Sequence, residues 1–173
     1  MPTVWTAVAI TGTFVLTCLL PITAIWIMVR RGKVSSMQIA DASERTMPYV
    51  YSSMGFLFWT YLLTAILHVP FYIGMVAVGG TVAIGIVAFI NQRWKISAHL
   101  TGFGGLFGGF ISYCIGIGAM PTWSGLSVWL ALSLLLMYAR LRLNAHTSTQ
   151  VVAGFLLGLS CTFRPYCILN YVL

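Results

Sequence analysis

The chain alternates long apolar runs with short polar connections. Six runs approach the roughly 20 apolar residues that a helix needs to cross a bilayer, and they lie at about residues 4–28, 49–69, 71–90, 100–120, 123–140 and 147–173. Unpaired backbone groups are not tolerated in hydrocarbon, and the period-two alternation of barrel strands is missing from these runs. The pattern therefore predicts an all-α fold, a bundle of six transmembrane helices in one domain covering residues 1–173.

The connections between the runs differ in length and polarity. Two of them, at 68–70 and 119–122, are short turns with a proline where the next helix should start. The connection from 30 to 48 is the longest, and it contains Asp41 and Glu44, the two acidic residues of the chain. Its length leaves room for a short surface helix or loop between the first two spans.

Composition supports a membrane location. The chain is 60% hydrophobic and 6% charged, whereas soluble domains carry about 25% charged residues. We therefore expect an integral, multi-pass membrane protein in contact with membrane lipids. The net charge of +7 does not indicate a nucleic-acid partner, because no basic soluble domain is present. The cysteines lie inside apolar runs without metal-ligand spacing, so no metal or cofactor is expected.

Basic residues gather on one side of the predicted bundle. If the six runs cross in order, the first, third and fifth connections share a face, and eight of the nine Lys and Arg residues fall there. The positive-inside rule would make this face cytoplasmic. His99 and His146 fall on the same face, at the starts of the fourth and sixth runs. Helix starts offer unpaired N–H groups and a partial positive charge, which suit a phosphate.

Glycine spacing indicates which helices pack most closely. Gly104 and Gly108 stand four apart in the fourth run, and Gly154 and Gly158 repeat this spacing in the sixth. Small residues on one face of a helix let backbones approach. The fourth and sixth helices are therefore predicted to lie inside the bundle, although close approach of a ligand is an alternative use of the glycines.

Three short motifs lie in order along the basic face. Residues 140–150 read RLRLNAHTSTQ, with five residues between Arg140 and His146 and three between His146 and Gln150. Residues 96–99 read ISAH, and residues 38–48 read QIADASERTMP. In order and spacing these stretches resemble the signatures SRxxxxxHxxxD, PSGH and KxxxxxxRP of the type 2 phosphatidic acid phosphatase superfamily of six-helix membrane enzymes.

The resemblance implies a mechanism without metal or cofactor. His146 would attack phosphorus to form a phosphohistidine, and His99 would protonate the departing lipid oxygen. Gln150 would orient His146 in place of the family's aspartate. The phosphate would be held by four further residues, namely Arg140, Arg45, Ser97 and Gln38. Ser97 has a second possible use, as the cap of a helix.

The motifs also depart from the family pattern. Glutamine replaces lysine at Gln38 and aspartate at Gln150, Ile96 and Ala98 replace proline and glycine, and Pro48 follows Arg45 at three residues. Gln150 leaves three alternatives: a weaker phosphatase, a substitute acceptor for His146 from Asp41 or Glu44, or a retired active site.

Three functions follow from these motifs. The first is a lipid phosphatase that hydrolyses a phosphate monoester or diphosphate. The second is an inactive relative that binds a lipid headgroup or serves as a structural subunit. The third is a small transporter, with Arg164 as a charge at membrane depth; the other explanation for Arg164 is snorkelling to the far interface.

Overall fold

The computed structural model describes residues 3–37, 39 and 44–169, without the side chains of residues 3, 5 and 164–169. Within this part of the chain all regular structure is helical, which confirms the all-α class. This part of the chain includes two short π-helical turns that adjoin α-helices. The elements are α1 (Thr3–Phe14), η1 (Val15–Leu19), α2 (Leu20–Arg30), α3 (Thr46–Tyr61), η2 (Leu62–Ile66), α4 (Phe71–Ile90), α5 (Ala98–Gly116), α6 (Trp123–Arg142) and α7 (Ser148–Leu169).

These elements form six continuous helical segments. The first segment joins α1, the π-helical turn η1 and α2, and the second joins α3 to the π-helical turn η2. Among the described residues, three helices are long and apolar enough to cross a membrane, namely Thr6–Arg30, Phe71–Ile90 and Trp123–Arg142. Large apolar side chains on α6 point outward, with Leu134 54% and Leu135 64% exposed.

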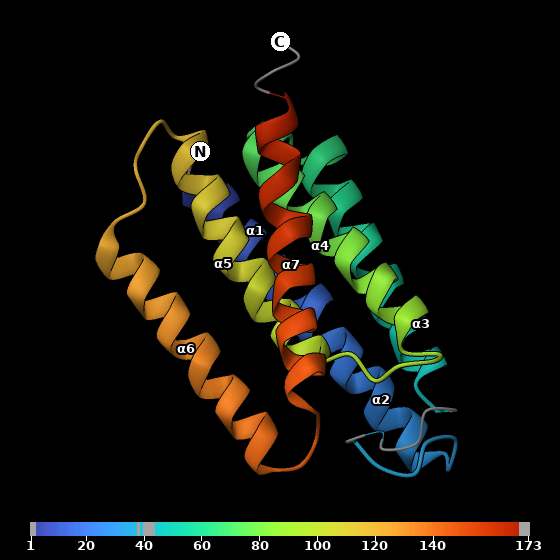
Figure 1. The fold of residues 1–173 in the computed structure, drawn as a ribbon. Coiled ribbons are helices and arrows are strands. Elements are labelled where there is room, and N and C mark those ends of the chain that lie inside the picture. Colours follow the sequence, from blue (N-terminus) through green and yellow to red (C-terminus); the bar gives the residue numbers. More distant parts are fainter. Residues whose placement is uncertain (1–2, 38, 40–43, 170–173) are drawn as a thin grey trace.

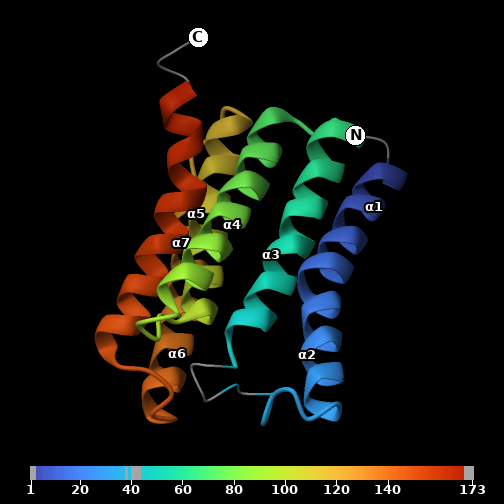
Figure 2. The ribbon, with the colours of Figure 1, turned by 90° about the vertical axis from the view of Figure 1, so that its right-hand side faces the viewer.

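Successive helices run in opposite directions. The connections after α2, α4 and α6 lie together at the lower end of Figures 1 and 2, whereas α1 begins and α7 ends at the upper end. We call the lower end the basic end, because the basic residues of these three connections gather there. In Figure 2 the helices follow one another from α1–α2 through α3 and α4 to α5 and α7.

The tightest contact in the bundle joins α5 to α7. A Cβ atom on Gly158 would collide with the backbone carbonyl of Thr101, and one on Gly104 would collide with that of Phe155. Ser112 adds a hydrogen bond, because its Oγ donates to the Thr162 carbonyl oxygen at 2.9 Å. The glycines of the fourth and sixth apolar runs thus allow close backbone approach, as expected, and the structure shows that the two helices approach each other.

The connection between the first two helical segments is fastened by Glu44. The carboxylate of Glu44 accepts hydrogen bonds from the Ser35 backbone N–H at 3.0 Å and from the Ser35 hydroxyl at 2.8 Å. Residues 31–37 form turns and bends, so the described part of this connection is loop and not helix. Gln38 and Asp41, which the sequence marks as candidates, lie outside the described residues.

Candidate active site

The starts of α5 and α7 are bonded to each other at the basic end. The backbone N–H of Ser97 donates to the Gln150 carbonyl oxygen at 3.3 Å, and Gly154 leaves room for the Ser97 carbonyl, which a Cβ would meet at 2.6 Å. His99 lies in the first turn of α5, and His146 lies in the connection that precedes α7. The direct bond between the helix starts therefore fixes the two histidine backbones relative to each other.

Ser97 caps α5. Its side chain is completely buried, and its Oγ accepts a hydrogen bond from the Leu100 N–H at 3.4 Å. Ser, Thr, Asp and Asn are preferred at this position because their oxygens satisfy N–H groups that have no partner in the first turn. Of the two uses expected for Ser97, the structure shows the capping contact.

The end of α6 brings Arg140 back toward His146. The N–H of Ala145 donates to the Arg140 carbonyl oxygen at 3.1 Å, and the N–H of Asn144 donates to that of Leu141 at 3.0 Å. Asn144 has a φ of 50°, which asparagine adopts more readily than most residues. This is a Schellman ending. It reverses the direction of the chain within a few residues. Arg140, before the reversal, and His146, after it, therefore both lie at the basic end.

His146 is oriented by two acceptors. Its Nδ1 lies 3.2 Å from the Lys95 carbonyl oxygen and 3.3 Å from Oε1 of Gln150. Both neighbours are oxygens that accept hydrogen bonds, so the proton of a neutral imidazole belongs on Nδ1. The lone pair is then on Nε2, which has no hydrogen bond within the described part of the chain.

Gln150 has two tasks at the start of α7. Besides its contact with His146, its Oε1 accepts a hydrogen bond from the Thr147 backbone N–H at 3.1 Å. A Thr followed three residues later by Gln is the sequence pattern of a capping box, and Thr147 and Gln150 form the half in which the glutamine reaches back. Glu44 accepts hydrogen bonds from Ser35, whereas the acceptors at His146 Nδ1 are the Lys95 carbonyl and Gln150.

Several basic side chains act on one another at this end, and we call them the basic cluster. Arg140 and His146 act electrostatically on His99, and Arg140 also acts on Lys95 and on His146. Arg45 joins the cluster through its effect on Lys95. The basic cluster thus consists of His99, His146, Arg140, Lys95 and Arg45.

Burial and the charges of the basic cluster shift the pKa values of His146 and Lys95, two members of the cluster that lie in loops. Burial lowers the pKa of His146 below the ordinary 6.5, and the charges of Lys95 and Arg140 lower it further, against the opposing effect of the two hydrogen bonds. Burial and the charges of Arg45 and Arg140 lower the pKa of the Lys95 ammonium. Each shift disfavours the positively charged form, so an anion bound here would relieve an existing repulsion.

The two arginines at the end of α6 have different surroundings. Arg140 has a buried Nε without a hydrogen-bond partner among the described residues. Arg142 is exposed, and its Nε donates to the Tyr138 hydroxyl at 2.8 Å with the guanidinium 5.4 Å from the Tyr138 ring centre. A buried, unpaired guanidinium nitrogen is costly. Among the described residues, the Nε of Arg142 is therefore satisfied by Tyr138, whereas the Nε of Arg140 is not satisfied.

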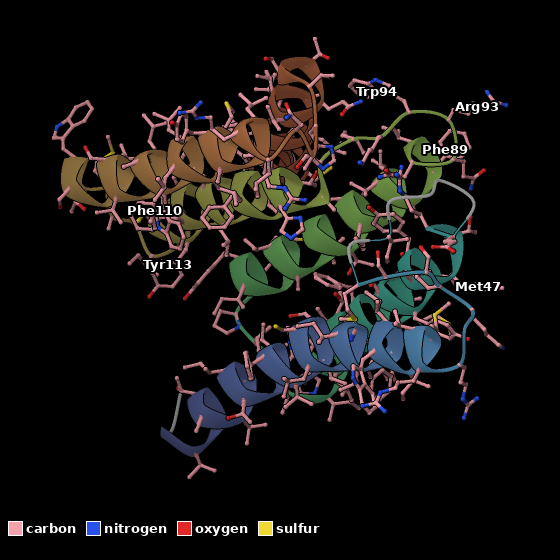
Figure 3. All side chains as sticks on the ribbon, turned by 90° about the horizontal axis from the view of Figure 1, so that it is seen from below. Met47, Phe89, Arg93, Trp94, Phe110 and Tyr113 are labelled. Carbon is pink, nitrogen blue, oxygen red and sulfur yellow. The ribbon has the colours of Figure 1, made fainter. Side chains whose placement is uncertain are left out.

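Arg45 is held at the start of α3. Its side chain is 7% exposed, and its Nε donates to the Ile39 carbonyl oxygen at 3.1 Å. The motif that contains it is completed by Gln38, which lies outside the described residues. Figure 3, a view from the basic end, shows a different situation for Arg93, which points away from the helices.

Sequence reasoning missed the contact between the Lys95 backbone and His146. The Lys95 carbonyl orients His146, and a backbone carbonyl leaves no signature in the residue type. The Thr147–Gln150 pair did carry a signal, because its spacing is that of a capping box. Among the described residues, no three His, Cys, Asp or Glu side chains gather where they could share a metal ion.

Comparison with protein-family models, with curated proteins and with solved structures finds no match to this chain. A fold of antiparallel helices is compatible with many functions, and function resides in the site that a fold carries. The functional conclusion therefore depends on the basic cluster itself.

Proposed function

We propose that this protein is an integral membrane lipid phosphatase, which hydrolyses the phosphate monoester or diphosphate of a lipid through a phosphohistidine intermediate. The observation that carries the proposal is the state of His146. Its Nδ1 is oriented by the Lys95 carbonyl and by Gln150, its Nε2 has no partner within the described residues, and the positive charges of Lys95 and Arg140 act on it. A nucleophilic histidine needs an oriented imidazole with a free lone pair, and the positive charges favour a phosphate beside it.

The first half of the reaction transfers the phosphoryl group to the protein. The Nε2 lone pair of His146 attacks phosphorus, and the bond from phosphorus to the lipid oxygen breaks with its electron pair on that oxygen. His99 donates a proton to the oxygen, and the lipid alcohol leaves. The Arg140 guanidinium binds the phosphoryl oxygens, where negative charge must be stabilised in the transition state.

The second half regenerates the protein. Water attacks the phosphohistidine, His99 accepts the proton of that water, and the bond from phosphorus to Nε2 breaks with its electron pair on nitrogen. Inorganic phosphate then leaves. In both halves Gln150 keeps the Nδ1 proton in place, but its amide brings no charge to stabilise an imidazolium. We therefore expect slower turnover than a carboxylate at this position would allow.

We also propose how the protein lies in the membrane. All six helical segments cross the bilayer, with the basic end at the cytoplasmic face, because basic residues concentrate in the connections of that end. The outward apolar side chains of α6, including Leu134 and Leu135, then lie in lipid. A cysteine introduced at Ser36 should react with an impermeant maleimide only after the membrane is opened. Labelling in intact cells would contradict the orientation.

The test of the chemistry uses purified protein in detergent micelles. Phosphate release is measured from phosphatidate and from farnesyl diphosphate, for the unaltered protein and for two matched variants, His146→Asn and His68→Asn. His68 lies outside the basic end, in the connection between η2 and α4, and has a φ of 45°, which asparagine tolerates. We expect His146→Asn to lose turnover by about a thousandfold or more and His68→Asn to keep it.

One observation favours a second candidate, a phosphate-binding relative without turnover. The described residues place no carboxylate beside His146, since Glu44 is bound to Ser35. Such a protein would bind phosphatidate in vesicles and release no phosphate from it. Equal, background-level phosphate release from the unaltered protein and from His146→Asn, with binding that is lost in Arg140→Ala, would establish this candidate in place of the phosphatase.

A further inference from the structure

An apolar cavity of about 740 Å³ begins at the basic cluster and continues into the bundle. It is bounded by α1 and η1 on one side, by α3 and α4, and by α5 on the other side. His99 and Ala98 line it at the basic end, and Tyr72 and Tyr113 line it at the other end. His99 thus belongs both to the basic cluster and to the wall of this cavity.

The length of the cavity follows from the residues of α5 that line it. The first lining residues of α5 are Ala98 and His99, and the last is Tyr113. At 1.5 Å per residue, His99 and Tyr113 are ~21 Å apart along the helix axis. One leaflet of a bilayer contributes ~15 Å of hydrocarbon. The cavity is therefore long enough for a chain that reaches beyond one leaflet.

Glycines keep the α5 wall open. A Cβ on Gly102 would meet nothing within 4 Å, and Gly105 and Gly109 line the same wall. Larger residues here would fill the space, as Phe110 does on the other face of α5, where it lies against Gly125 of α6 (Figure 3). The glycines of α5 therefore have two uses, contact with α7 and clearance for the cavity.

The opposite wall contains both π-helical turns. Thr17 of η1 and Leu63 of η2 line the cavity. A π-helical turn accommodates an extra residue at a cost in stability and is found most often at functional sites. The first helical segment is joined to α3 by Trp59, whose indole N–H donates to Thr13 Oγ1 at 2.8 Å. Gly12 provides the space that the Trp59 ring fills.

Two tyrosines line the end of the cavity that lies farthest from His99. The rings of Tyr72 on α4 and Tyr113 on α5 meet edge to face, with centroids 5.8 Å apart and an angle of 66° between planes. Figure 3 shows Tyr113 far along α5 from the basic end. Tyr72 is fixed from behind, because a Cβ on Gly116 would lie 2.5 Å from its ring. Tyr113 is 46% exposed and has fewer constraints.

We infer that this cavity binds the hydrocarbon chain of the phosphorylated lipid and that the Tyr72–Tyr113 pair sets the chain length. The inference rests on the proposed function and adds to it the substrate class, a lipid phosphate with one long linear chain. With its phosphate at His99 and Arg140, such a chain follows the glycine face of α5 and ends against the tyrosine rings. Burial of each methylene stabilises the complex until the chain meets Tyr113.

The first test compares alkyl phosphates of increasing chain length. Octyl, dodecyl, hexadecyl and icosyl phosphate are supplied in mixed micelles, and kcat/KM for phosphate release is measured. The unaltered protein should prefer hexadecyl to octyl phosphate by about tenfold or more and discriminate against icosyl phosphate. Tyr113→Ala should move the optimum toward icosyl phosphate. Leu106→Trp, which narrows the cavity ~10 Å from His99 along α5, should move it toward octyl phosphate.

The control is Tyr61→Ala, a change of the same size at an exposed position of α3 outside the cavity lining. It should keep the unaltered length profile. Tyr61→Ala should also keep the rate of phosphate release from p-nitrophenyl phosphate, which has no chain, and thereby show that the basic cluster is intact. Identical chain-length profiles in the unaltered protein, Tyr113→Ala and Leu106→Trp would overturn the inference.

A second measurement separates this inference from the phosphatase proposal. Hexadecyl phosphonate, which cannot be hydrolysed, carries a diazirine on its last carbon, and cross-linked peptides are identified by mass spectrometry. Adducts in the segments around Tyr72 and Tyr113 support chain binding, including when no phosphate substrate is turned over. Adducts on the outer face of α6 around Leu135, with none at Tyr72 or Tyr113, would overturn chain binding even when turnover is observed.

Discussion

Nδ1 of His146 lies 3.3 Å from Oε1 of Gln150 and 3.2 Å from the carbonyl oxygen of Lys95, so a neutral amide and a peptide group orient the candidate nucleophile. Neither acceptor carries a charge. The imidazole is held in one tautomer, while the imidazolium that would form during catalysis gains little electrostatic stabilisation. The relationship is testable because Gln150 can be changed without altering the length of its side chain.

Gln150→Glu should accelerate phosphate release. The carboxylate can accept the same hydrogen bonds from His146 and from the Thr147 N–H, and it adds a negative charge beside the imidazole and near the start of α7, where a negative charge is favourable. We expect kcat to rise by roughly tenfold, since about one pKa unit of stabilisation corresponds to that factor. The matched variant Gln150→Leu, which removes both contacts, should lower kcat and the melting temperature together. A lower kcat in Gln150→Glu than in the unaltered protein would contradict the assigned role.

Arg140→Lys should weaken phosphate binding and turnover. Lysine keeps the charge but loses the planar set of donors that matches a phosphate, so kcat/KM should fall by about tenfold to a hundredfold. Arg142→Lys is the control, because Arg142 lies in the same turn and is engaged with Tyr138 outside the cluster. Equal effects of the two substitutions would mean that only the overall charge of this helix end matters.

Acid should destabilise the fold through His146. The folded-state pKa of His146 lies below the ordinary 6.5, so the unfolded chain binds more protons than the folded chain as the pH falls through 6.5 toward the folded value. The contribution of His146 to the free energy of unfolding is therefore complete above 6.5 and is lost below it. Melting temperatures of the unaltered protein and of His146→Asn, measured across this range, should show a smaller acid loss in the variant. An identical loss would place the titrating group elsewhere.

Gly158→Ala should separate α5 from α7. The added methyl group would collide with the Thr101 carbonyl, and relief of that contact requires a backbone shift that costs about 3 kcal/mol in the free energy of unfolding. Gly85→Ala is the control, because a Cβ there meets nothing within 4 Å, and alanine should stabilise the α4 helix by up to about 1 kcal/mol. Thermal unfolding in detergent measures both. Similar melting temperatures for the two variants would show that the α5–α7 contact does not limit stability.

Hydrophobic runs predicted the six helical segments because each helix here is mostly apolar around its whole circumference. The ends were less accurate where local hydrogen bonds decide them. α5 begins at Ala98 and not at 100, since Ser97 caps it, and the second segment ends at Ile66 and not at 69, since His68 adopts a positive φ. Glycine spacing predicted close backbone approach to α5 and α7 because the absence of a side chain is itself the signal, but it did not show that the two helices contact each other.

The candidate site was predictable only in its residue types. The order of the motifs predicted that His99, His146 and Arg140 lie at one end of the bundle. The directions of the helices in the structure place all three at the basic end. Contacts made by backbone atoms could not be predicted, because a backbone carbonyl leaves no signature in the residue type. The sequence also could not show whether Glu44 bonds to His146 or to Ser35, because several acceptors compete for each donor at similar distances along the chain. The cavity was equally hidden, since its lining residues come from helices far apart in sequence.

The hydrogen bond between Trp59 and Thr13 joins α3 to the first helical segment, whose place in the bundle differs from that of the α5–α7 pair. The first helical segment contributes no member of the basic cluster, and the indole of Trp59 on α3 bonds to it at Thr13, beside the cavity wall. If the cavity binds the hydrocarbon chain as we infer, substitutions along α1 and η1 would change which chain is admitted, while the α5–α7 pair keeps the two histidines in place. Chain selectivity and phosphate chemistry would then be encoded in different helices.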